Sequence, residues 1–171
     1  MKKAFCLILF TLAIVQQAIS GPLSEADIKA QELRLLNWVK TCVSPCIMPE
    51  ALKTGGTAAF FIAGGWALAS RGVELRVDGV DQCNSGCTLL VDQMKKWGGK
   101  VCVGKGVVWG MHRSRIWDKN GNEILRETPV YEALPIAQWI SAHGGIPQNG
   151  KWANTPPDSV LWAAYGRCPG A

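Results

Sequence analysis

The sequence has few charged residues and only two histidines and two tyrosines, and it lacks a basic run, an internal repeat and a low-complexity tract. Charged residues make up 18% of the 171 residues and hydrophobic residues 48%, a composition that excludes a disordered or collagen-like chain. The net charge of +5 is spread along the chain, so we expect no nucleic-acid partner. The length fits one domain.

No hydrophobic run reaches the roughly 20 residues that a membrane-spanning helix needs, so we expect no stable membrane anchor. The start of the chain instead has two lysines and an apolar run over residues 4–15. Small residues follow, and they fit cleavage by a signal peptidase after Ser20. These features predict a signal peptide over residues 1–20, followed by one domain over 21–171. We therefore expect an exported protein of bacterial type, either periplasmic or secreted.

The cysteines fit an oxidising compartment. Removal of the predicted signal peptide takes Cys6 away and leaves an even number of cysteines, which favours disulfides. The disulfide candidates are Cys42, Cys46, Cys83, Cys87, Cys102 and Cys168. The sequence alone does not choose among their pairings. A zinc site is the alternative, but the spacing lacks a C-x-x-C knuckle, so we expect no metal and no cofactor.

The hydrophobic pattern predicts alternating helices and strands. The expected helices cover residues 24–41, 57–71, 87–97, 129–143 and 157–165, and the expected strands cover 73–78, 101–103 and 107–111, with a turn at 79–86. Ser24 is the expected N-cap of the first helix. The helix at 57–71 is apolar on every face, which predicts that it is buried. Alternation of this kind is typical of a single α/β domain with a largely parallel sheet.

Eight tryptophans are an unusual number for this length. On the predicted helices we expect them to be buried: Trp38, Trp66, Trp97 and Trp139. The tryptophans better placed to line a functional site are Trp109, Trp117 and Trp152.

Ser85 lies where the predicted turn at 79–86 passes into the predicted helix at 87–97, and Gly86 follows it. The free N–H groups and the positive dipole end of a helix start can stabilise an oxyanion, so a serine in this place suits acyl transfer. A serine at a helix start is also a common N-cap, and on this segment alone the cap is the more common role. Both interpretations stay open.

His112 and the pair Gly55-Gly56 favour the catalytic interpretation. His112 stands at the end of a predicted strand, and the glycine pair enters a predicted helix, where it can bring a backbone N–H close to a ligand. The thiols of Cys83 and Cys87 are alternative nucleophiles for the same histidine. Two cysteines that flank a turn in an exported protein are, however, more often disulfide-bonded.

Several motifs follow one another in a set order. They are Thr54-Gly55-Gly56, a helix end at Arg71-Gly72, the strand at 73–77, Ser85 between Cys83 and Cys87, and His112 followed by Arg113. In this order the chain resembles the superfamily of the Clp protease proteolytic subunit and the crotonases, and within it the exported bacterial Clp-like proteins with a C-x-S-x-C segment. The resemblance implies a Clp/crotonase-like fold with a mostly parallel sheet and flanking helices, and it implies a homo-oligomer.

The resemblance also implies the role of each site residue. Ser85 matches the nucleophile and His112 the general base, while the N–H groups of Gly56 and Gly86 match the oxyanion hole. The acidic third member of the family would fall near residues 153–154, where the chain has no carboxylate. The candidates in this region are Asn154 and Asp158.

The expected function is that of an exported serine peptidase-like hydrolase, which cleaves an amide or ester of a peptide or protein substrate. The expected geometry places Ser85 Oγ within hydrogen-bond reach of a ring nitrogen of His112. The alternative is a catalytically inactive Clp-like module for binding or assembly in an envelope or secretion apparatus.

Overall fold

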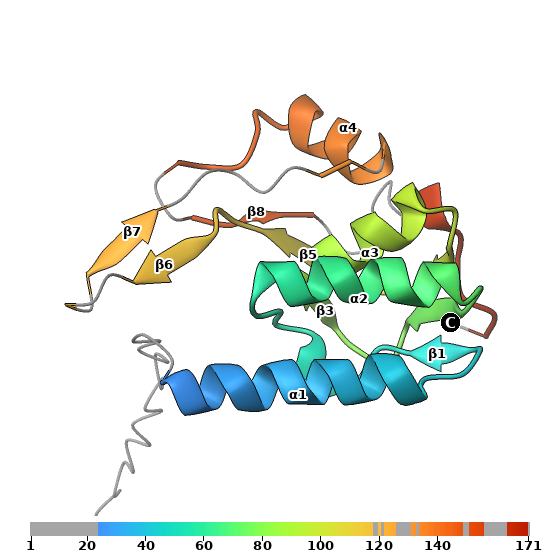
Figure 1. Cartoon of the computed structure of the whole chain (residues 1–171). Helices are drawn as coiled ribbons and strands as arrows, with labels where there is room; N and C mark the ends of the chain where they lie inside the picture. The colour runs from blue at the N-terminus through green and yellow to red at the C-terminus, as the bar shows by residue number, and fades with distance from the viewer. Residues whose placement is uncertain are drawn as a thin grey trace, which may run out of the picture.

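A computed structural model describes residues 24–117, 120, 122–125, 131–132, 134–148, 151–155 and 164–170. In these residues helices and short strands alternate and form a mixed α/β domain, as Figure 1 shows. The predicted signal peptide, residues 1–20, lies outside the described residues. None of the described helices combines the length and the hydropathy that crossing a bilayer requires.

The helices follow the predicted pattern closely. They are α1 (Glu25–Thr41), α2 (Ala58–Ser70), α3 (Gly86–Lys96) and α4 (Leu134–Ala142). Ser24 caps α1 as expected, because its Oγ accepts a 3.2 Å hydrogen bond from the Asp27 N–H. Helix α4 begins later than predicted, and the residues just before it, 131–132, are not helical. Most of the helix predicted at 157–165 lies outside the described residues.

The strands form two small sheets and a hairpin. In the first sheet β2 (Glu74–Val77) lies between β1 (Cys46–Ile47) and β4 (Lys100–Val103), and both pairings are parallel. In the second sheet β5 (Val108–Met111) lies between β3 (Gln82–Asn84), to which it is parallel, and β8 (Ala153–Asn154), to which it is antiparallel. The hairpin joins β6 (Arg115–Trp117) and β7 (Glu123–Leu125). The short 3₁₀ helix η1 (Glu50–Leu52) follows β1.

The segment at 79–86 corrects the prediction of a simple turn, because β3 lies within it. Residues 82–84 have polar side chains on both sides of Cys83 and no run of apolar residues, so the hydrophobic pattern does not identify a strand there. They are extended because they pair with β5, with Cys83 opposite Trp109 and Asn84 opposite Gly110. This pairing brings the end of β3 beside the end of β5.

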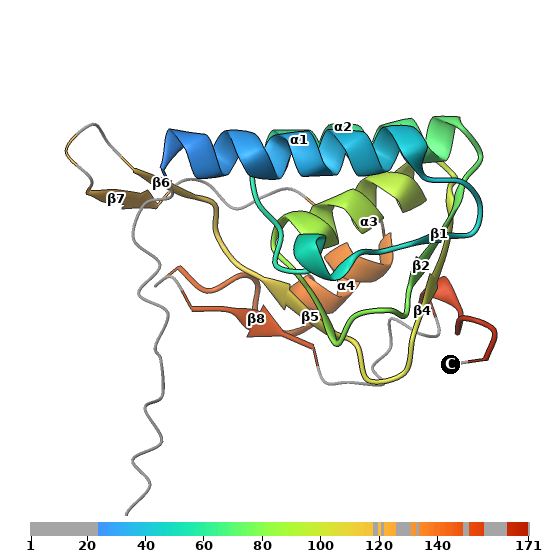
Figure 2. The same cartoon turned by 90° about the horizontal axis from the view of Figure 1, so that it is seen from below.

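Helix α3 lies at the centre of the domain. In Figure 2 it lies between the layer of α1 and α2 above and the strands β3, β5 and β8 below. Every residue from Gly86 to Met94 is buried. Helix α2 packs closely on it because Gly65 has no side chain: a Cβ there would collide with the Leu90 carbonyl oxygen and stand 2.9 Å from Gln93 Cβ. The glycines of α2 therefore position the helix that begins just after Ser85.

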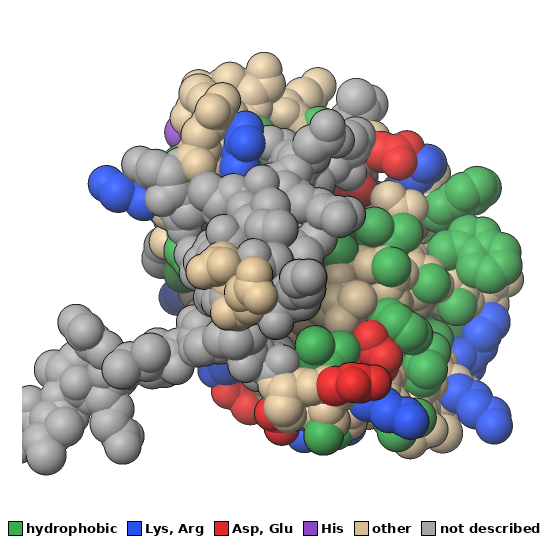
Figure 3. All heavy atoms as spheres, turned by 60° about the vertical axis from the view of Figure 1, so that its left-hand side comes forward, with side chains coloured by type: hydrophobic (Ala, Val, Ile, Leu, Met, Phe, Trp, Pro, Cys, Tyr) green, Lys and Arg blue, Asp and Glu red, His purple; other side chains and the backbone are tan. Residues whose placement is uncertain are grey.

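The prediction that α2 is buried on every face is wrong. Its outer face is exposed and consists mainly of Ala59, Ile62, Ala63 and Trp66. Trp66 is 51% exposed, and Trp97 beyond α3 is 55% exposed, whereas Trp139 is buried as expected and Trp38 is partly buried. Among the residues that the structure describes, α2 has packing partners on one side only. Figure 3 shows apolar side chains gathered on the side of the molecule where the outer face of α2 is exposed.

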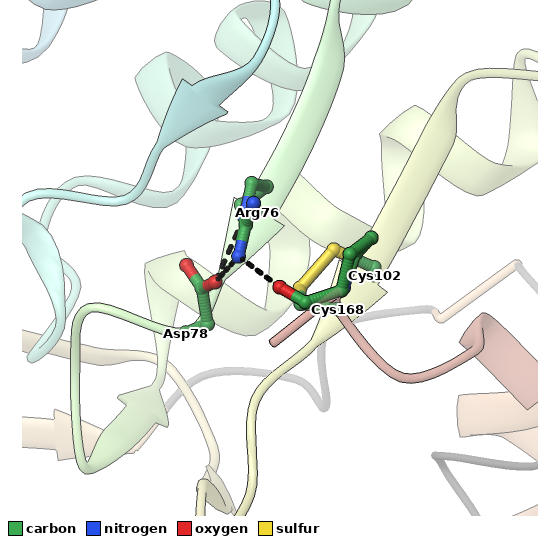
Figure 4. A network of polar contacts seen from close by, with 5 residues as sticks. Arg76, Asp78, Cys102 and Cys168 are labelled. Atoms are coloured by element: carbon green, nitrogen blue, oxygen red, sulfur yellow. Dashed lines mark hydrogen bonds and ion pairs between the residues drawn. A yellow bond between two sulfur atoms is a disulfide. The ribbon is translucent and has the colours of Figure 1, made fainter. Parts of the chain in front are cut away.

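The C-terminal segment is fastened to the first sheet, as Figure 4 shows. Cys168 forms a disulfide with Cys102 of β4, and the Cys168 N–H donates a 3.0 Å hydrogen bond to the Val103 carbonyl. Arg76 of β2 bonds both to the Asp78 carboxylate and, at 3.0 Å, to the Pro169 carbonyl. The disulfide therefore joins parts of the chain that are 66 residues apart.

Candidate active site

Ser85 occupies the junction between β3 and α3 in an unusual backbone conformation. Its φ is 52° and its ψ is −118°, and it is the only non-glycine residue with a positive φ in the described part of the chain. Such a conformation costs of order 1–3 kcal/mol, and residues that hold one are concentrated at functional sites. The Ser85 N–H donates a 2.8 Å hydrogen bond to the Gly110 carbonyl of β5, which fixes the turn against the neighbouring strand.

The N-cap interpretation of Ser85 is wrong. Ser85 is the N-cap residue of α3 by position, but its side chain makes no capping hydrogen bond. Its Oγ instead lies 2.8 Å from Nε2 of His112. His112 directly follows β5, and β5 is parallel to β3, so the carboxyl ends of the two strands present both side chains at the same place. The structure thus brings together the two residues that the sequence separates by 27 positions.

The three cysteine pairs are Cys42–Cys46, Cys83–Cys87 and Cys102–Cys168. They use all six disulfide candidates and fit an exported protein. The second pair flanks Ser85, and both of its cysteines are completely buried. A thiol nucleophile at Cys83 or Cys87 is therefore excluded in this state, because both sulfurs are bonded.

The pair Gly55-Gly56 approaches the Ser85 turn. Gly55 has a φ of 81°, and a Cβ on it would collide with the Gly86 nitrogen and stand 2.8 Å from Ser85 Cβ. A Cβ on Gly86 would stand 3.0 Å from the Gly56 nitrogen. The N–H groups of Gly56 and Gly86 are thus neighbours, and within the described residues no hydrogen bond from either is found. Two such donors beside a serine can bind an oxyanion.

Lys53 connects the turn at Gly55-Gly56, the glycine turn, to the turn at Ser85, the serine turn. Its carbonyl accepts a 2.7 Å hydrogen bond from the Asn84 N–H, one residue before Ser85. Its ammonium contacts Asp81 at 2.8 Å and also pairs with Glu50. The hydrogen bond between Lys53 and Asp81 raises the pKa of Lys53 and lowers the pKa of Asp81. Both groups therefore stay charged over the ordinary pH range.

We predict two candidates for the third member of the triad, Asn154 and Asp158. Asn154 lies on β8, opposite Gly110 of β5, and it is exposed. Asp158 lies outside the described residues. Asn154 and Asp158 both stay predictions.

Of the three tryptophans expected at the site, only one is found there among the described side chains. The ring of Trp152 contacts the ring of His112, with 4.1 Å between the centroids, and Trp152 is exposed. Trp109 is instead buried in the core and stacks on Tyr165. The side chain of Trp117 lies outside the described part.

Two buried polar residues behind the serine are not indicated by the sequence pattern. Thr88 and Tyr131 are both buried, and their hydroxyl oxygens are 2.7 Å apart. Burial raises the pKa of the Tyr131 phenol, so the phenol stays protonated and can donate. The pair could not be foreseen because 43 residues separate the two hydroxyls. The only local signal is a threonine three residues after Ser85.

Comparison with protein-family models, with curated proteins and with solved structures gave no match. The chemistry of the site is therefore inferred from its own geometry.

Proposed function

We propose that this protein is an exported serine hydrolase of peptidase type, in which Ser85 attacks an amide or ester carbonyl of a peptide or protein. The observation that carries the proposal is the 2.8 Å contact between Ser85 Oγ and His112 Nε2, made by a serine with a φ of 52°. A serine is a weak nucleophile until a base accepts its proton. A strained serine that bonds a histidine instead of capping its helix fits this requirement.

The reaction follows from the groups around Ser85. As Ser85 Oγ forms a bond to the carbonyl carbon, its proton moves to His112 Nε2, and the carbonyl oxygen becomes an oxyanion. The N–H groups of Gly56 and Gly86 donate hydrogen bonds to this oxyanion. His112 then gives the proton to the leaving group, whose bond to carbon breaks. Water then attacks the acyl carbon as its proton moves to His112. The bond between that carbon and Ser85 Oγ breaks, His112 returns the proton to Oγ, and the acid is released.

The fold that we propose is of Clp/crotonase type. Its support is the chain order of the glycine turn, α2, β2, the serine at the start of α3, and the histidine after β5. The parallel pairings β1–β2, β2–β4 and β3–β5 are compatible with it.

Burst kinetics with p-nitrophenyl acetate test the hydrolase without a known substrate. We expect the wild type to release about one equivalent of p-nitrophenol in a burst, because the acyl-serine forms faster than it is hydrolysed. Ser85→Ala should abolish the burst. Ser70→Ala, which changes an exposed serine at the end of α2, should retain it. A folded wild type that gives no burst, or a burst that survives in Ser85→Ala, contradicts the proposal.

The exposed face of α2 favours a second candidate, a Clp-like module that assembles with further copies of itself. Helix α2 contains no charged residue, and an exposed helix normally has a polar outer face. We expect sedimentation to show an oligomer for the wild type and a smaller species for Trp66→Lys. Val43→Lys, at an exposed loop position after α1, is the control and should leave the oligomer intact. A monomeric wild type contradicts assembly through this face.

A further inference from the structure

The two candidate oxyanion donors belong to two peptide units, Gly55–Gly56 and Ser85–Gly86. Both peptide bonds are trans, since the only cis bond in the described part of the chain is Ser44–Pro45. In a planar trans peptide the C=O and the N–H point in opposite directions. A group that holds the carbonyl of such a unit therefore also fixes the direction in which its N–H points.

A side chain of α1 holds the first carbonyl. Gln31 Nε2 donates a 2.6 Å hydrogen bond to the Gly55 oxygen, and the contact is partly buried. The side chain also packs against the glycine turn, because a Cβ on Gly56 would stand 2.8 Å from Gln31 Nε2. The Gly56 N–H consequently points away from Gln31.

A relay of two hydroxyls holds the second carbonyl. Thr88 Oγ1 donates a 2.6 Å hydrogen bond to the Ser85 oxygen, which also accepts from the N–H groups of Thr88 and Leu89. Thr88 has a single hydroxyl proton, and this bond uses it. The 2.7 Å contact between Thr88 Oγ1 and the Tyr131 hydroxyl must then have Tyr131 as the donor. Hydrogen bonds aligned in this way polarise one another, which strengthens the Gly86 N–H as a donor.

The segment that carries Tyr131 is itself held against α3 by a hydrogen bond and an ion pair. The next residue, Glu132, donates its N–H to the buried Asp92 carboxylate at 3.1 Å, and its side chain pairs with Lys96. Thr88, Asp92 and Lys96 are four residues apart and so share one face of the helix. Threonines in helices often bond the carbonyl one turn before them, but such a bond does not need a tyrosine from a distant segment.

From these contacts we infer that Gln31, Thr88 and Tyr131 are positioning residues, which aim the N–H groups of Gly56 and Gly86 at the oxyanion by holding the carbonyls behind them. The inference rests on the proposed function and adds residues that touch neither the substrate nor the reacting atoms. It predicts that their loss slows the chemical step and leaves substrate binding unchanged.

The rate at which a fluorophosphonate probe labels the full chain measures this effect. Removal of an oxyanion-hole donor costs about 10²–10³ in rate, so a poorly aimed donor should cost about tenfold to a hundredfold. We expect losses of this size in Thr88→Val and Gln31→Met, and a smaller loss in Tyr131→Phe. Thr88→Ser keeps the hydroxyl and should label at nearly the wild-type rate. With p-nitrophenyl acetate the losses should appear in kcat and leave KM unchanged.

Tyr165→Phe is the matched control, because Tyr165 is also a buried tyrosine but no described group bonds its hydroxyl. It should label like the wild type. Wild-type rates in folded Thr88→Val and Tyr131→Phe overturn the inference. So does a Thr88→Ser variant as slow as Thr88→Val, because the loss would then come from packing. A folded wild type that is not labelled is a different result, since it overturns the proposed function itself.

Discussion

Substitution of Gly55 by alanine tests whether the glycine turn approaches the serine turn as closely as the structure shows. The new Cβ would collide with the Gly86 nitrogen and would stand 2.7 Å from the Asn84 oxygen and 2.8 Å from Ser85 Cβ. Two of these three contacts are with backbone atoms, which cannot turn away as the end of a side chain can. The two turns must then separate, and the two candidate oxyanion donors separate with them.

The cost of Gly55→Ala has two parts. Alanine at a φ of 81° costs about 1–2 kcal/mol, as for any residue with a Cβ in the left-handed region. Overpacking adds about 1–3 kcal/mol. We therefore expect the free energy of unfolding to fall by about 2–5 kcal/mol, a large part of the 5–15 kcal/mol typical of a domain.

Gly72→Ala is the matched control, because Gly72 has a φ of 66° and no atom within 4 Å of an added Cβ. It carries the conformational cost without the collision. Urea unfolding, followed by circular dichroism, gives both free energies, and fluorophosphonate labelling gives the effect on the site. A Gly55→Ala variant that loses no more stability than Gly72→Ala and labels at the same rate would refute the close approach of the two turns.

Three further predictions concern the disulfides, the buried phenols and the start of the mature chain. Replacing Cys102 and Cys168 by serine opens a link between residues 66 apart and should lower the free energy of unfolding by about 4 kcal/mol in urea, whereas a negligible change would contradict the pairing. Burial raises the pKa of the Tyr131 and Tyr165 phenols above the unfolded value of about 10. The unfolded chain therefore loses these protons more readily, so the free energy of unfolding should be unaffected below pH 10 and should fall as the pH rises further. Unfolding free energies measured from pH 8 to 11 should show the fall, and changing both tyrosines to phenylalanine should reduce it. Mass spectrometry of the exported protein after alkylation should find Gly21 as the first residue and no alkylated cysteine, and two or more alkylated cysteines would contradict this.

The pairing of Ser85 with His112 could be predicted because it follows from order along the chain. The helix that begins after Ser85 and the two strands that follow it can bring the chain back to the start of that helix when the strands are parallel. The sequence shows this alternation through the apolar positions of β2, β4 and β5. It also shows the glycine pair at 55–56, whose lack of side chains permits a close approach.

Contacts between distant segments could not be predicted in this way. Trp66 and Trp97 look like core residues by type, yet their exposure depends on which sides of α2 and α3 have neighbours. The contact of Thr88 with Tyr131 joins residues that no local pattern relates. Strand β3 is likewise formed by its neighbour β5 and not by a strand-like sequence of its own.

Site mapping after reaction with a fluorophosphonate identifies the nucleophile, because the probe reacts only with an activated serine and needs no known substrate. We expect one phosphonyl group per chain, attached to Ser85 and absent from Ser85→Ala and His112→Ala, while Ser70→Ala is labelled like the wild type. A folded wild type that carries no label, or a label on another residue, would contradict it.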